Sequence, residues 1–171
     1  MVVIQTSRLL LREFTLEDAE AFFLLNSDPE VLHHTGDPGV RDVAEARKVL
    51  LERPIADYQK HGYGRWACIE KATGELIGFA GLKYLDELKD VDLGYRFRPA
   101  WWGRGLATEA SRPVVEYGFQ TLGLPHILGL VKPEHTPSVR VLTKLGFRDD
   151  GLMEYFGQQV ARYVIHRQNP S

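Results

Sequence analysis

A strand-like run, a short glycine loop and a helical pattern follow one another within residues 91–110. The run ends at Pro99, the loop carries Gly103 and Gly105, and the helical pattern begins by Leu106. A loop of this kind leaves backbone N–H groups unpaired at the positive end of the helix dipole. The segment is therefore typical of a phosphate-binding site made from main chain.

Composition excludes several other kinds of site. The 171 residues, 44% hydrophobic and 26% charged, suit one soluble globular domain, which we place over residues 1–171. A net charge of −2 argues against a nucleic-acid-binding face. No apolar run approaches the roughly 20 residues of a membrane span, so we expect no membrane partner and no signal peptide. Cys68 is the only cysteine, which excludes an internal disulfide and favours a cytoplasmic location.

Turn and capping signals divide the chain into strands and helices. We expect strands over residues 8–14, 63–71, 75–85, 91–98, 126–132, 147–156 and 160–166, and helices near 15–26, 41–60, 105–122 and 136–146. Pro54 is expected to break the second helix. Residues 27–39, with two Asp-Pro steps, are predicted as a loop. Gly94 indicates a bulge or the close approach of another group.

Three segments carry a family resemblance. They are Thr6 to Arg12, Trp102 to Ala110, and Pro133 to Ser138 with the helix end at Lys144 to Phe147. Together they resemble the GNAT superfamily of acyl-CoA-dependent N-acyltransferases, most closely its ribosomal-protein N-terminal acetyltransferases. The resemblance implies an α+β (mixed α/β) fold in a single domain. Its mostly antiparallel mixed sheet of about seven strands would have helices on both faces and be splayed between residues 91–98 and 126–132.

Three positions depart from the family pattern. Trp102 stands where Gln or Arg is frequent in the coenzyme loop. His135 stands where an Asn usually opens the last helix and helps to position the coenzyme or a bound water. Leu142 stands where many relatives have a tyrosine near the leaving sulfur. The resemblance therefore moves the interaction with the leaving group to Ser138, which Thr136 and Pro137 would place at the second position of the helix.

The resemblance also implies acetyl-CoA as the acyl donor. Its expected binding residues are Tyr95, Arg96, Phe97, Gly103, Arg104, Gly105, Leu106, Ala107, Thr108, His135 and Ser138. Loop N–H groups would hold the pyrophosphate, and the strand backbone would hold the pantetheine amides and the thioester carbonyl. Each position also has a purely structural interpretation: a tight turn, a solvated arginine, a core strand or a helix-start serine.

Two residues are candidates for catalysis. Ser138 would protonate the leaving thiolate or hold the water that does so. Asp92 would accept the proton of the attacking amine, although a surface role is an alternative, and Glu70, Glu109 and Glu154 compete for the task.

The function that follows is transfer of an acetyl group from acetyl-CoA to a primary amine, either a protein N-terminus or a small molecule. Direct attack in a ternary complex is favoured because Cys68 lies mid-strand with no nearby His. A non-catalytic acyl-CoA-binding sensor is the alternative. We expect no metal, since His33 and His34 lack a third ligand at recognisable spacing. The chain is expected to be a monomer or homodimer, with residues 27–60 and the final hairpin on the acceptor side.

Overall fold

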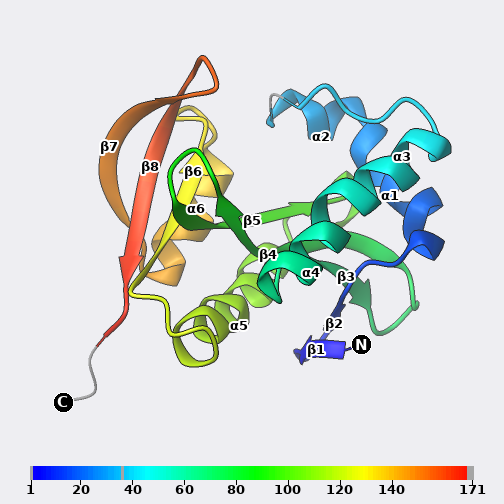
Figure 1. The fold of residues 1–171 in the computed structure, drawn as a ribbon, viewed down its shortest axis with the longest axis horizontal. Coiled ribbons are helices and arrows are strands. Elements are labelled where there is room, and N and C mark those ends of the chain that lie inside the picture. Colours follow the sequence, from blue (N-terminus) through cyan, green and yellow to red (C-terminus); the bar gives the residue numbers. More distant parts are fainter. Residues whose placement is uncertain (1, 36, 169–171) are drawn as a thin grey trace.

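The computed structural model describes residues 2–35 and 37–168. Within them, eight strands form one sheet in the order β1-β2-β3-β4-β5-β6-β8-β7 (Figure 1). The strands are β1 (Val2–Gln5), β2 (Leu9–Arg12), β3 (Arg65–Glu70), β4 (Leu76–Leu85), β5 (Asp90–Phe97), β6 (His126–Val131), β7 (Arg148–Tyr155) and β8 (Gln158–His166). The helices are α1 (Ala19–Ser27), α2 (Pro29–His33), α3 (Val43–Leu50), α4 (Ala56–His61), α5 (Leu106–Gln120) and α6 (Thr136–Leu145).

The mixed, mostly antiparallel sheet is confirmed, with β5–β6 as its parallel pair. The sheet has one strand more than the expected seven, because β1 adds an edge that the sequence pattern did not delimit. Figure 1 shows β6, β8, β7 and α6 at one end of the sheet, and α1 to α4 at the other.

The predicted splay lies between β5 and β6. These strands pair at Asp92↔Leu128, whereas β4 and β5 pair continuously from Gly78↔Phe97 to Leu85↔Asp90. The edge of β5 that faces β6 is therefore left without a strand partner beyond this point. Main-chain groups on this edge of β5 are therefore not used in a strand ladder.

Gly94 does not form a bulge with β4, because the β4–β5 ladder runs across it without a shift. Its other sequence interpretation, close approach, is confirmed. A Cβ atom at Gly94 would lie 2.4 Å from the guanidinium carbon of Arg65. Only glycine lets that side chain lie against the strand.

Helices cover both faces of the sheet, as expected. Alternate residues of β3 point to opposite faces because side chains alternate along a strand. Trp66 and Cys68 pack in the core beneath α5 and α6. Ala67 and Ile69 pack in a second core with α1 and α3. The sheet therefore lies between two separate cores.

Two helix boundaries differ from the sequence expectations. The predicted loop at residues 27–39 contains α2, because Asp28 caps it by accepting from the Glu30 N–H at 3.0 Å and Pro29 occupies its first turn. In the last helix, Thr136 was the expected N-cap and Pro137 the first helical residue, but His135 is the N-cap, so Ser138 is the third helical residue and not the second.

The break at Pro54 is confirmed. A wide, π-helical turn at Leu51–Ile55 contains this proline and separates α3 from α4. Proline has no N–H to donate, so a regular α-helical turn could not be completed there.

Candidate active site

The loop before α5 presents a row of unpaired backbone N–H groups. Gly103 and Gly105 have φ angles of +75° and +76°, and Gly105 is the N-cap of the 15-residue helix. Among the described residues, the N–H groups of residues 103–108 have no hydrogen-bond acceptor, and residues 102–105 are exposed. Such a helix start binds anions through its dipole and its free donors. The loop therefore fits the pyrophosphate of a coenzyme.

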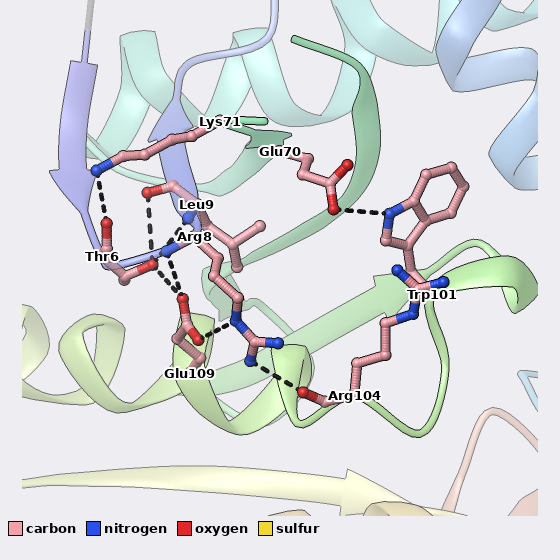
Figure 2. A network of polar contacts seen from close by, with 8 residues as sticks. All are labelled: Thr6, Arg8, Leu9, Glu70, Lys71, Trp101, Arg104 and Glu109. Atoms are coloured by element: carbon pink, nitrogen blue, oxygen red, sulfur yellow. Dashed lines mark hydrogen bonds and ion pairs between the residues drawn. The ribbon is translucent and has the colours of Figure 1, made fainter. Parts of the chain in front are cut away.

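Side chains from the first strands hold this loop in shape (Figure 2). Arg8 donates from Nη2 to the Arg104 carbonyl at 2.9 Å and from Nε to Glu109 at 2.8 Å. Glu109 also accepts from the Thr6 hydroxyl at 2.6 Å and from the Arg8 N–H at 3.0 Å. Burial raises the pKa of Glu109, but these hydrogen bonds and the Arg8 charge together bring it below its usual value. The first strands and the loop before α5 are thus held together by one network of hydrogen bonds.

Two tryptophans fix the other end of the loop. Trp101 Nε1 donates to Glu70 at 3.1 Å (Figure 2), and Trp102 Nε1 donates to the Phe97 carbonyl at 2.7 Å. Phe97 itself is buried in the core below α5. The loop is therefore braced between β3 and the end of β5.

Tyr95 links β5 to the first turn of α6 across the splay. Its hydroxyl donates to the Ser138 carbonyl at 3.2 Å. Burial raises the pKa of Tyr95 to about 12, so it stays a neutral donor. The Ser138 hydroxyl in turn lies 2.5 Å from His135 Nδ1. The structure thus brings together three of the predicted residues, Tyr95, His135 and Ser138.

His34, at the end of α2, is a neighbour that sequence reasoning did not assign to this group. Its ring lies 4.4 Å from that of His135 and 6.1 Å from that of Trp102, between ring centroids. Burial and the nearby His34 lower the pKa of His135, whose imidazole is therefore neutral at pH 7. The adjacent histidines in the early segment were the only signal, and they do not indicate a partner about 100 residues away.

Arg96 and Asp92 lie on the opposite face of β5 from Tyr95. Arg96 donates to the Asn26 side chain, and its Nη1 lies 3.6 Å from an Asp37 carboxylate oxygen. Asp92 is 7% exposed and accepts from Arg65 at 2.9 Å. The structure therefore groups these two residues with α1 and β3 rather than with the coenzyme loop.

The other candidate carboxylates differ in their surroundings. Glu70 accepts from Trp101 and Thr73, and Glu109 belongs to the network around Arg8. Glu154 is exposed on β7.

A cavity of about 340 Å³ lies beside Arg96, between the sheet and helices α1 and α3. Its apolar lining includes Phe14, Phe22 and Phe79. The cavity therefore adjoins β5 on the face that does not carry Tyr95.

Cys68 is fully buried, and burial raises the pKa of its thiol. A buried neutral thiol is a poor nucleophile. Residues 2–35 and 37–168 contain no group of three or more side chains suited to hold a metal ion, and no helix in them is long and apolar enough to cross a membrane.

Comparison with known proteins gives matches over most of the chain. A family model described as an acetyltransferase (GNAT) domain matches residues 8–148. The chain is 34% identical over 166 residues to an uncharacterised N-acetyltransferase, p20, of Bacillus licheniformis, covering 96% of this chain and 92% of that protein.

Solved structures share the whole fold. An acetyltransferase from Agrobacterium tumefaciens superposes with a TM-score of 0.84 at 26% identity, over 98% of this chain and 95% of that one. RimL, a ribosomal-protein alpha-N-acetyltransferase in complex with coenzyme A, gives 0.83 at 18% identity, over 98% of its chain and 97% of this one. Spermidine N-acetyltransferase from Vibrio cholerae, with CoA and spermine, gives 0.77 at 21% identity, over 94% of this chain and 96% of that one.

Proposed function

Since this chain belongs to the GNAT family of acetyl-CoA-dependent N-acetyltransferases, we propose that residues 1–171 act as one domain that acetylates a primary amine by direct attack in a ternary complex. The observation that carries the proposal is the row of free N–H groups at residues 103–108, next to the unpaired edge of β5. The first would hold the coenzyme phosphates, and the second would hold its amide-bearing arm.

Direct attack is supported by the state of the only thiol. The amine would form a bond to the thioester carbonyl carbon, the C–S bond would break, and the sulfur would leave with a proton. Cys68 is buried, and burial raises its thiol pKa, so it is unsuited to carry the acetyl group in between. Holding both reactants together can supply about 7–11 kcal/mol of the barrier reduction.

Ser138 is the residue that we propose for the leaving sulfur. It lies on the first turn of α6, and its hydroxyl is within 2.5 Å of the neutral His135 ring. In the tautomer that carries its proton on Nδ1, the neutral ring would donate to the Ser138 oxygen and leave the hydroxyl hydrogen free for the sulfur. Tyr95 fixes the backbone of the same residue. A hydroxyl held in this way can donate to a thiolate as negative charge develops there.

The proton of the amine has a less direct route. Asp92 was the sequence candidate, but its carboxylate is paired with Arg65. Protonating it would leave that guanidinium without its partner charge. We therefore propose that Asp92 keeps its ion pair with Arg65, and that water next to the bound amine accepts the amine proton.

The acceptor class can be tested directly. Acetyl-CoA is incubated with peptides bearing free N-termini, polyamines and amino acids, and release of free thiol is followed against a control without amine. Amine-dependent thiol release supports the proposal. Tight binding of acetyl-CoA with no release from any class would favour the sensor function instead.

The sole, buried cysteine agrees with the cytoplasm as the proposed location.

A further inference from the structure

The cavity and the coenzyme contacts lie on opposite faces of β5. Side chains alternate along the strand, so Tyr95 points toward α6 while Arg96 lines the cavity. An acceptor in the cavity would therefore approach β5 from the face that the coenzyme contacts leave free. This makes the charges of the cavity the natural determinant of acceptor chemistry.

The carboxylates that line the cavity already have cationic partners. Asp57 binds Lys83 at 2.8 Å, and Asp37 lies 3.6 Å from Arg96. Glu45 is paired at 2.7 Å with Arg41, which lies outside the cavity. A cationic acceptor would have to displace one of these side chains to reach a carboxylate.

Cationic side chains exceed carboxylates in the lining. Four of them, Arg53, Arg65, Lys83 and Arg96, face three carboxylates. Among the described residues, Arg53 has no ion-pair partner. Burial lowers the pKa of Arg96, and the charges of Arg65 and Arg53 add to this effect, whereas Asp37 opposes it. An anion bound among these guanidinium groups would relieve their repulsion.

Arg65 has a different task from the other two arginines. It donates to the Gly81 carbonyl at 2.8 Å and to the carbonyl and carboxylate of Asp92 at 3.1 and 2.9 Å. Both terminal nitrogens of Arg65 thus donate within the protein. Arg96 uses Nη1 for the Asn26 side chain and for Asp37. Among the described residues, the guanidinium donors left for a ligand are therefore those of Arg53 and the Nε and Nη2 groups of Arg96.

An apolar wall completes the cavity. Phe14 and Phe22 meet edge to face at 5.5 Å between centroids, and Phe79 lies under the Arg96 guanidinium at 5.3 Å. Rings beside a cationic group suit a ligand with an apolar part next to an anionic part.

Resting on the proposed function, we propose that the acceptor is a small amino carboxylate: a primary amine whose carboxylate binds Arg53 and Arg96 and whose apolar part contacts the phenyl rings. A polyamine has no group for these guanidiniums and would add positive charge to a lining in which cations already exceed carboxylates by one. The amide that follows a peptide N-terminus also lacks the charge that they would bind.

Matched acceptors test this inference. L-phenylalanine and phenethylamine differ by one carboxylate, as do L-ornithine and putrescine. Phenylalaninamide separates charge from amine basicity, because its amine is less basic and its carbonyl is neutral. We expect kcat/KM, followed by thiol release, to favour the carboxylates by about tenfold or more. Equal or better turnover of phenethylamine, phenylalaninamide or putrescine, or acetylation of peptide N-termini alone, would overturn the inference.

A pair of variants locates the effect. Arg53→Gln should raise KM for phenylalanine about tenfold and reduce the preference for phenylalanine over phenethylamine. Arg47→Gln removes the same charge from an exposed position of α3 outside the cavity, and should leave the preference unchanged. A preference that Arg53→Gln does not alter would contradict the assignment of Arg53.

The inference and the proposed function can fail separately. Turnover of polyamines but not of amino carboxylates would refute the inference alone. Absence of turnover with every amine would refute the proposed function. Calorimetry on the protein saturated with coenzyme A would then still decide the inference, because it predicts tighter binding of phenylalanine than of phenethylamine, and equal affinities would overturn it.

Discussion

The two faces of β5 are built by different means. The face toward α5 and α6 offers main-chain N–H groups, set by glycines at positive φ and by a helix start. The face toward α1 and α3 offers long side chains in ion pairs, such as Arg96 with Asp37 and Lys83 with Asp57. Main-chain groups suit the acyl donor, acetyl-CoA, because its phosphates and amides are always the same. Side chains can be exchanged one at a time, which suits an acceptor that differs between relatives.

The largest expected effect is on kcat, at helix α6, which we propose lies beside the thioester of bound acetyl-CoA. Ser138→Ala removes the hydroxyl beside His135. We expect kcat to fall roughly ten- to a thousandfold with coenzyme affinity nearly intact, because the hydroxyl acts mainly in the transition state. Steady-state kinetics and calorimetry on one preparation measure both quantities.

Thr143→Ala is the matched control for this change. Thr143 lies on the same helix, but its hydroxyl donates to the Val139 carbonyl at 2.8 Å, away from His135. It should spare kcat. If Ser138→Ala also spares kcat and only lowers the melting temperature, Ser138 has a structural role and the interaction with the thiolate passes to a bound water.

The next effect tests whether acetyl-CoA binding depends on main-chain N–H groups of the loop before α5. Gly105→Val places a branched side chain at a φ of +76°, at the N-cap of α5 and within the row of free N–H groups. Acetyl-CoA affinity should fall by about tenfold or more, equivalent to about 1.4 kcal/mol, in calorimetry. Gly74→Val carries similar backbone strain at +74° in the turn between β3 and β4, with open space around it. Equal affinities of the two folded variants would show that the loop does not hold the coenzyme.

Local signals explain how much of this could be predicted from the sequence. The glycine loop, the break at Pro54 and the turn between the last two strands each depend on a few adjacent residues, and all were found where expected. Even a local signal can be misread, since Asp28 and Pro29 cap a helix but resemble a turn. The loop before α5 could be predicted because glycine conformation and helix starts are local properties.

Contacts between distant residues account for what could not be predicted. Arg8 and Glu109 are 101 positions apart, and Arg96 and Asn26 are 70 apart. Nothing in the spacing of these residues fixes which charge meets which. The paired state of Asp92 with Arg65 belongs to the same class of contact. It makes Asp92 half of an ion pair, which is the ground for proposing that water, and not Asp92, accepts the amine proton.

A smaller effect tests the ion pair and hydrogen bonds of Glu109, which hold the loop before α5 in shape. Glu109→Gln keeps the side chain's shape but removes its charge from Arg8 and Thr6. Because Arg8 is 46% exposed, we expect a loss of about 1–2 kcal/mol in the free energy of unfolding at pH 7. Glu116→Gln is the control, since Glu116 is exposed on the same helix.

The pH dependence of this loss has a definite sign. The pKa of Glu109 is lower in the folded protein than its usual 4.5. Its contribution is therefore complete above the unfolded pKa and disappears as pH falls through the folded pKa. Urea unfolding should give wild type and Glu109→Gln converging stabilities below about pH 4. A constant difference across that range would exclude the charge as the cause.

The smallest expected effect tests whether the acetyl group passes from acetyl-CoA to the amine without first being bound to Cys68. Cys68 is buried beneath α5 and α6, and burial raises its thiol pKa, so neither face of β5 offers it to a thioester. Cys68→Ala should retain most of kcat/KM and lose only about 1 kcal/mol of stability, because the change removes one buried sulfur atom. Mass spectrometry of the wild type with acetyl-CoA and no amine should show an unchanged protein mass. An acetyl group on Cys68 that moves into product when amine is added would mean that the acetyl group crosses the core first, and the two faces of β5 would no longer suffice to describe the reaction.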